Sequence, residues 1–292
     1  MNRFLLVDGH NLLFRMFYGM PDNFYTPAGN KYNAVYGFMS AMSKVMYLID
    51  PSRAIVLFDS PDCGERRTLD EDYKANRPDF SDAAPNDCPF TQLPAIYAFL
   101  RDAGIPMREI HGCEADDVIA SYAVNSPEDL HPVIFSTDRD YWQLVSDRVS
   151  ILDYHGMDSS LITPASVQKK FGVRPDQFAD MKCLIGDKSD NITGVPGVGP
   201  KRAAELLCRY ETISGIFDHI DEIERPAIRK ALLESRERIE LNNRLIRLSG
   251  DAPLPIDPEY LAFTCRFPSN MMLSAMNYAD EYADFGREAA QL

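Results

Sequence analysis

Acidic residues follow three short apolar runs of the sequence. Short apolar runs bounded by polar residues are typical of buried strands. The runs and the acids after them are Phe4–Val7 with Asp8, Ala54–Phe58 with Asp59, and Val133–Phe135 with Asp138 and Asp140. If these strands are parallel, their carboxyl ends meet at one edge of the sheet, where open α/β sheets bind ligands. An aspartate is also a common helix cap or turn residue, so the argument rests on three such positions coinciding.

Two further acidic clusters have helical spacing. Glu114, Asp116 and Asp117 stand at the start of a predicted helix, and Glu114 and Asp117 share one face because they are three residues apart. Asp187 and Asp190 have the same spacing. Acids in a first helical turn also complement the helix dipole, so the first cluster alone has a purely structural interpretation as well.

The nine carboxylates could converge on one crevice, and so many like charges need compensation. Divalent ions that prefer oxygen ligands would supply it, and Mg²⁺ or Mn²⁺ suits phosphate chemistry best. Two such ions about 4 Å apart stabilise the attacking and the leaving oxygen of a phosphoryl displacement. The sequence contains no C-x-x-C or H-E-x-x-H motif, so zinc hydrolysis fits poorly. The candidate metal ligands are Asp8, Asp59, Glu114, Asp116, Asp117, Asp138, Asp140, Asp187 and Asp190.

A glycine-rich stretch precedes a helix predicted to start near Pro200. Gly194, Gly197 and Gly199 allow close backbone approach, and the free N–H groups of a helix start favour an anion. Lys201 and Arg202 add positive charge there. The stretch therefore suits a phosphate backbone held without regard to sequence. An ordinary glycine-rich turn between helices is the alternative.

Strand and helix patterns alternate in the first half of the chain. A fourth strand is predicted at Val149–Leu152, and amphipathic helices at Ala34–Leu48 and Leu93–Asp102. This alternation predicts an α/β fold with a mainly parallel sheet flanked by helices. Residues 78–94 are rich in helix breakers and carry no Lys or Arg, which indicates a loop. From Thr163 onward the pattern is predominantly helical, so we expect domains at 1–180 and 181–292.

Charge is distributed unevenly along the 292 residues. The chain has 30 basic and 44 acidic residues and a net charge of −14, which by itself argues against nucleic acid as a partner. The excess acid lies in residues 1–193 and in the tail after residue 250, whereas residues 194–248 carry 10 basic and 9 acidic residues. Bound divalent ions would invert the local field of an acidic patch. No apolar run has the length of a membrane span or a secretory signal, and the six scattered cysteines indicate reduced thiols, so we expect a cytoplasmic protein.

Six ordered motifs resemble the bacterial and phage 5′→3′ exonuclease and flap endonuclease family, which also forms the N-terminal nuclease of bacterial DNA polymerase I. The resemblance extends to about Pro255, and because the chain ends at Leu292 we expect a stand-alone relative without a polymerase. The motifs are Val7–Gly9 with Leu12–Arg15, Phe58-Asp59, Asp72–Pro78, Glu114–Asp117, Thr137–Leu144 and Gly186–Lys201.

The resemblance implies a PIN-like nuclease core with a mobile arch at about residues 63–95, followed by a helix–two-turn–helix region that holds duplex DNA. An acidic C-terminal tail, outside the resemblance, completes the expected second domain. The resemblance assigns the five carboxylates from Asp8 to Asp117 mainly to a first metal ion, and the four from Asp138 to Asp190 mainly to a second. Arg66 and Lys74 match the basic residues that stabilise the scissile phosphate. The implied DNA contacts are Arg15, Tyr73, Arg77 and the hairpin residues Gly194, Gly197, Gly199, Lys201 and Arg202. Two Mg²⁺ ions are the implied cofactors, with Mn²⁺ as a substitute and a K⁺ ion in the hairpin.

These observations predict a monomeric metal-dependent 5′-nuclease for duplex DNA with a 5′ end, flap or nick, and an RNA strand in a hybrid is left open as a substrate. Two other protein classes fit part of this pattern. A DNA-binding module whose ions serve only folding is disfavoured by the complete carboxylate set. A small-molecule phosphatase lacks an Asp-x-Asp motif after the first strand, where the sequence reads Asp8-Gly9-His10, and leaves the glycine stretch without a role.

Overall fold

A six-stranded sheet forms the centre of the molecule in the computed structural model, which describes residues 2–60 and 65–289. The strand order is β3-β2-β1-β4-β5-β6, and all neighbours are parallel except β5 and β6. The four predicted strands are confirmed, but β3 and β6, of three residues each, are too short to give a sequence pattern. The strands are β1 (Asn2–Asp8), β2 (Arg53–Phe58), β3 (Met107–Glu109), β4 (Leu130–Phe135), β5 (Ser150–Asp153) and β6 (Ser160–Ile162).

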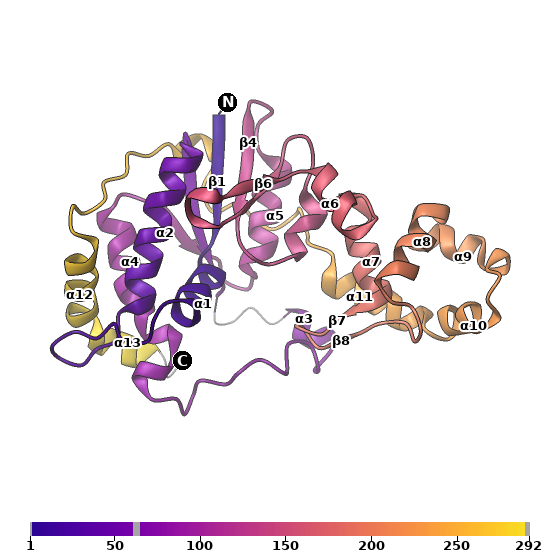
Figure 1. Ribbon diagram of the computed structural model, residues 1–292, viewed down its shortest axis with the longest axis horizontal. Helices are drawn as coiled ribbons and strands as arrows, with labels where there is room; N and C mark the ends of the chain where they lie inside the picture. The colour runs from indigo at the N-terminus through magenta and orange to yellow at the C-terminus, as the bar shows by residue number, and fades with distance from the viewer. Residues whose placement is uncertain (1, 61–64, 290–292) are drawn as a thin grey trace.

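Helices cover both faces of the sheet (Figure 1). Successive side chains of a strand point to opposite faces. Leu5 and Val7 of β1 accordingly join an apolar cluster with α1 (Gly9–Gly19), α2 (Asn33–Ile49) and α4 (Leu93–Asp102). Phe4 and Leu6 join a second cluster with α5 (Ala115–Asn125) and α7 (Phe178–Ile185). Because both faces are buried, the strands are continuous apolar runs without alternation.

The helical part of the chain extends from the sheet at one end of the long axis, where α8, α9 and α10 lie (Figure 1). Residue 180, near which the sequence predicts the domain boundary, lies inside α7, whose apolar side chains share one cluster with α5 and α8. The elements of this part are α6 (Pro164–Phe171), α7, the two-stranded β7 (Gly186–Asp187) and β8 (Ile192–Thr193), α8 (Pro200–Tyr210), α9 (Ile213–Asp218), α10 (Pro226–Glu234) and α11 (Arg236–Ile246).

The expected arch begins with α3 (Glu65–Leu69) and continues in turns to the start of α4; its residues 63 and 64 lie outside the described residues. Single-turn 3₁₀ helices lie at η1 (Pro85–Asp87), η2 (Pro89–Gln92), η3 (Asp140–Leu144), η4 (Gly156–Asp158), η5 (Pro175–Gln177), η6 (Ile220–Glu222) and η7 (Pro258–Leu261). The tail forms α12 (Met271–Glu281), which packs on α2 and α4, and α13 (Ala283–Ala289). None of the helices within residues 2–60 and 65–289 has the length and hydropathy of a membrane-spanning helix.

Candidate metal centre

Asp8 occupies the carboxyl end of the central strand. Its Oδ1 atom accepts a hydrogen bond from the backbone N–H of Asn11 (3.0 Å), so Asp8 caps α1. Its Oδ2 atom accepts from the hydroxyls of Ser136 (3.1 Å) and Tyr141 (3.0 Å). Burial, together with the charges of Asp59 and Asp138, raises the pKa of Asp8 to about 7. An ionised carboxylate here therefore needs a cation nearby.

Asp59 joins the end of β2 to the start of α5. Its Oδ1 atom accepts from the backbone N–H of Ala115 (2.8 Å), and its Oδ2 atom lies 3.1 Å from Nδ1 of His10. Burial alone would raise the pKa of Asp59, but His10, the N–H of Ala115 and the charge of Lys74 together lower it to about 2. Asp59 thus stays ionised beside a neighbour, Asp8, that resists ionisation.

The helix-start acids face two basic side chains. Arg66 donates from Nη1 to Glu114 (2.7 Å) and Asp116 (3.2 Å), and from Nη2 to Asp117 (2.7 Å). Nζ of Lys74 donates to the Glu114 carboxylate at 2.8 Å. Burial lowers the pKa of both cations, but the carboxylates raise it by more, so the pKa of each lies above its ordinary value and both stay charged. Burial, with the charge of Asp116 next in effect, raises the pKa of Asp117 to about 6.

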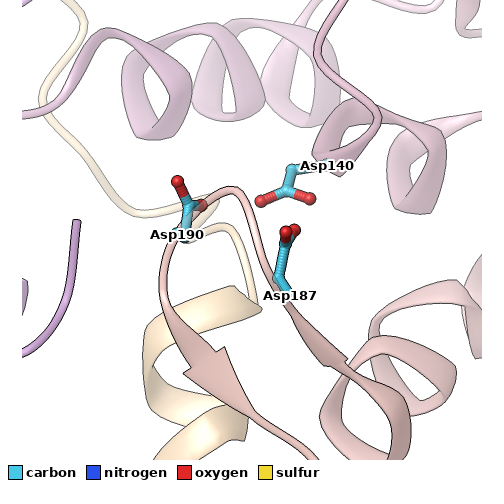
Figure 2. Close-up of side chains that lie close together, drawn as sticks. All are labelled: Asp140, Asp187 and Asp190. Carbon is cyan, nitrogen blue, oxygen red and sulfur yellow. The ribbon is translucent and has the colours of Figure 1, made fainter. Parts of the chain in front are cut away.

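The second acidic group comes from three different elements. Asp140 at η3, Asp187 on β7 and Asp190 in the turn before β8 bring one carboxylate oxygen each within 4.8 Å of the others (Figure 2). Three convergent oxygen ligands form a site suited to a hard divalent cation. Burial raises the pKa of Asp138 to about 6; the charge of Lys182 lowers it, and the charges of Asp116 and Asp190 raise it. The backbone N–H of Asp140 donates to Oδ1 of Asp138 at 2.8 Å, so Asp138 lies next to the second acidic group.

Lys182 on α7 is a functional candidate that the sequence interpretation missed. Its side chain is buried, and its ammonium group forms ion pairs with both Asp140 and Asp187. Its neighbours Met181 and Cys183 are buried and apolar, so the local pattern is that of a core helix. The one available signal was a lysine at a buried position of an amphipathic helix, because a buried lysine needs an anionic partner.

The remaining predicted phosphate and DNA contacts lie in different surroundings. Arg77 is half exposed and donates to Asp190 at 3.1 Å. Tyr73 is 3% exposed and packs in the apolar cluster. Nζ of Lys74 lies over its ring, 4.7 Å from the ring centre. Arg15 donates to the backbone oxygen of Tyr154 (2.6 Å) beyond β5. Of these three side chains, Arg77 is the one next to the second acidic group.

The three glycines before α8 differ in their surroundings. A methyl group at Gly194 would lie 2.2 Å from the carbonyl carbon of Ile185, so this glycine permits close packing of β8 against the end of α7. Gly197 has a φ of +77°, and Arg202 donates to its carbonyl oxygen. Gly199 caps α8 and is open to solvent. The structure thus gives Gly194 a packing role that the sequence interpretation did not include.

The site gathers oxygen ligands at one sheet edge and surrounds them with Arg66, Lys74, Arg77 and Lys182. All nine predicted ligands are carboxylates, a donor set that fits Mg²⁺ or Mn²⁺ and not a thiolate or imidazole metal site. A parallel α/β sheet with such an edge and a helical region beside it defines a divalent-metal-dependent nuclease.

Comparison with known proteins gives the family. Residues 3–172 match the N-terminal resolvase-like domain of 5′-3′ exonucleases, and residues 173–266 match their C-terminal SAM-fold domain. The chain therefore belongs to the 5′-3′ exonuclease family. The predicted family, the α/β fold with a following helical region and the enzyme class are confirmed.

Individual relatives agree with this assignment. The 5′-3′ exonuclease of Aquifex aeolicus is 34% identical over 262 residues, which cover 89% of this chain and 86% of that protein. The thermostable DNA polymerase I of Thermus thermophilus is 37% identical over 256 residues, and the chain spans only 30% of its length. The solved structure of T5 5′-exonuclease with bound zinc has 25% identity and a TM-score of 0.68, covering 99% of this chain and all of that one.

Proposed function

We propose that this nuclease hydrolyses phosphodiester bonds of DNA at or near a 5′ end, as a 5′→3′ exonuclease and 5′ flap endonuclease. The observation that carries the proposal is the pair of acidic groups at the sheet edge, each of which forms ion pairs with a buried cation. Phosphoryl transfer needs positive charge around a phosphate and ligands for metal ions, and this arrangement supplies both.

The carboxylates divide between two Mg²⁺ ions, with Mn²⁺ as a substitute. Asp8, Asp59 and the three acids at the start of α5 would hold the first ion; Asp138, Asp140, Asp187 and Asp190 would hold the second. Bound divalent ions supply a water of lowered pKa and charge stabilisation at the scissile phosphate. The side chains of Arg66 and Lys74 both donate to Glu114 of the first group, so they are close enough to bind a non-bridging oxygen of a phosphate held there.

Duplex DNA is held beside the metal centre by the start of α8. Gly197 and Gly199 leave the backbone open to a phosphate, and Lys201 is exposed next to them. Such contacts do not read bases, which suits a nuclease that recognises the shape of a DNA end. We propose that the carbonyl groups of this hairpin also hold a K⁺ ion.

The T5 D15 flap endonuclease, whose fold this chain shares with 23% sequence identity and a TM-score of 0.67, has been solved as a complex with DNA and metal ions.

The test uses a DNA duplex with a single-stranded 5′ flap, labelled at either end in separate samples. We expect Mg²⁺-dependent release of products from the 5′ side, none with EDTA, and retained DNA binding without cleavage in Asp187→Asn. Product lengths distinguish cutting at the junction from stepwise trimming. Tight binding without cleavage in both Mg²⁺ and Mn²⁺ would contradict the proposal and support a binding module.

The proposal extends to the nucleic acid that is cut, the oligomeric state and the cellular location. A substrate whose 5′ strand is RNA, run beside the DNA flap, tests activity on hybrids. We expect a monomer, because one chain supplies all the residues of the candidate site. The molar mass from light scattering tests this expectation. A cytoplasmic location follows from the substrate.

A further inference from the structure

Two segments far apart in the sequence are joined next to the metal centre. We call residues 70–77, which carry Lys74, the lysine turn, and residues 187–191 the aspartate turn. The backbone N–H of Lys74 donates to the carbonyl oxygen of Asp190 (3.0 Å), and Arg77 donates to the Asp190 carboxylate (3.1 Å). The two turns therefore meet at both the backbone and the side chain of Asp190.

Two asparagines join the same turns in opposite directions. Nδ2 of Asn76 donates to the backbone oxygen of Lys188 (3.0 Å), and Nδ2 of Asn191 donates to the backbone oxygen of Asp72 (2.9 Å). Each turn thus donates one side-chain amide to the backbone of the other. We call this reciprocal pair the asparagine clip.

The backbone at the junction is held in an uncommon conformation. Lys74 has a φ of +57° and Asn191 a φ of +59°, both in the left-handed region that non-glycine residues rarely adopt. Such conformations persist when surrounding contacts determine them, and they are frequent at functional sites. The hydrogen bonds across the two turns are among those contacts, because they engage the backbone N–H of Lys74 and the side chain of Asn191.

We propose that Asn76 and Asn191 are positioning residues, which fix the lysine turn to the aspartate turn so that Lys74 keeps its place relative to the acidic groups. The inference rests on the proposed nuclease function. The lysine turn up to Arg77 is thereby joined to the turn that carries Asp187 and Asp190.

The clip is distinct from the packing of the core. Both asparagine side chains are exposed, so their removal leaves no cavity, whereas Tyr73 of the lysine turn is buried in the apolar cluster. Neither asparagine is one of the nine carboxylates. Loss of the clip should therefore misplace Lys74 without unfolding the domain.

The experiment compares Asn76→Ala, Asn191→Gly and the double variant. Glycine at position 191 keeps the left-handed backbone and removes only the amide. Asn125→Ala is the matched control, because Asn125 is also exposed and also donates to backbone carbonyls, but at the opposite end of α5 from Glu114. The readouts are the single-turnover cleavage rate with Mg²⁺, the Kd for flap DNA in EDTA, the melting temperature, and hydrogen exchange of the metal-free protein.

We expect each single variant to cleave about tenfold more slowly, with the Kd changed less than about twofold, since a positioning role acts on the chemical step. The double variant should lose far less than the product of the two single effects, because the clip acts as one unit. In each clip variant the backbone amide of Lys74 should exchange faster, while the melting temperature stays that of the wild type. The Asn125→Ala control should match the wild type in all four readouts. These results together support the clip.

Unchanged rates and unchanged exchange at Lys74 would overturn the inference. An equal loss of rate and affinity would reassign the asparagines to DNA binding, and a lower melting temperature with faster exchange throughout would make them structural. If the wild-type protein does not cleave DNA, the proposed function fails, but exchange at Lys74 still tests the clip by itself.

Discussion

At the scale of single residues, each acidic group at the sheet edge faces a cation from another element. Arg66 from α3 contacts three carboxylates at the start of α5, and Lys182 on α7 contacts Asp140 and Asp187. Buried ion pairs of this kind are costly to break from one side, because the remaining charge stays buried without compensation. Under the proposed function, the same cations would stabilise the negative charge of a phosphodiester monoanion and the further charge that develops in its transition state.

Replacing Lys74 with alanine should slow cleavage by about 100-fold, because a single positioned donor to a developing charge is worth that much. The Kd for flap DNA should change little, since affinity for DNA comes from many phosphate contacts. Single-turnover rates and binding curves measure the two quantities. The control is Lys188→Ala, which removes an exposed positive charge from the neighbouring turn. Equal losses in rate and affinity would make Lys74 a binding residue, and an equal effect of the control would indicate a general electrostatic cause.

Replacing Lys182 with methionine should lower the free energy of unfolding in EDTA by about 3 kcal/mol, because Asp140 and Asp187 are left without their partner. Mg²⁺ should stabilise this variant more than the wild type, since a bound ion takes over the compensation. Urea unfolding with EDTA and with Mg²⁺ tests this, with Lys169→Met on the exposed face of α6 as the control. The same loss under both conditions would show that Lys182 does not compensate the metal ligands.

At the scale of elements, the hairpin before α8 combines two tasks in one glycine-rich stretch. Gly186 has a φ of +77°, and Gly194 lies against the backbone of Ile185 and Gly186, so the two allow β7 and β8 to close directly after α7. This closure presents Asp187 and Asp190 to Asp140. The residues after Gly194 then lead to the exposed start of α8, where a phosphate can bind.

Gly194→Ala should therefore lower the stability of the protein, whereas Gly199→Ala should lower its affinity for duplex DNA. Alanine at 194 meets the backbone of Ile185 and should lower the free energy of unfolding by about 3 kcal/mol, as overpacking does. Alanine at 199 meets no heavy atom within 4 Å of the added methyl group, so stability should change by no more than about 0.5 kcal/mol. Duplex affinity should fall in Gly199→Ala because a side chain is added to the open backbone at the start of α8, where we propose that a phosphate binds. Urea unfolding and DNA binding in EDTA measure both effects, and the reverse order would contradict the assignment.

At the scale of the whole molecule, metal binding, proton binding and folding are linked. The pKa values of Asp8, Asp117 and Asp138 are raised, mainly by burial, to about 7, about 6 and about 6, above the ordinary carboxyl value of 3.8. Between pH 4 and 7 the folded metal-free protein therefore binds more protons than the unfolded chain. Its free energy of unfolding falls as the pH rises through this window.

Mg²⁺ should consequently stabilise the protein more at pH 8 than at pH 5, because the ion binds the ionised carboxylates. The lowered pKa values of Asp59 and Asp187 act in the opposite sense, but that effect operates below pH 4, outside this window. Melting temperatures at the two pH values, with EDTA and with Mg²⁺, test the prediction. Asp8→Asn should flatten the pH dependence in EDTA. Equal stabilisation by Mg²⁺ at both pH values would show that these carboxyls do not bind the ion.

Features of this protein that depend on local residue pattern could be predicted before the fold was known. Buried parallel strands are short apolar runs, and the acids directly after them lie at the sheet edge, so Asp8, Asp59 and Asp138 could be located from the order of residues alone. The motifs around Lys74 and Asp187 carried the family and the enzyme class. Even the bounds of the helix Leu93–Asp102 followed from periodicity and from the glycine after it.

Contacts between distant segments became visible only in the folded chain. The pairing of Lys182 with Asp140, the packing of Gly194 on Ile185, the burial of Tyr73 and the reciprocal bonds of Asn76 and Asn191 are not local patterns. Apart from Gly194 and Ile185, the partners in these contacts come from segments about 40 to more than 100 residues apart. A side chain's burial and charge partner depend on the packing of all elements around it, and hydrophobic periodicity specifies which face is buried but not what it is buried against.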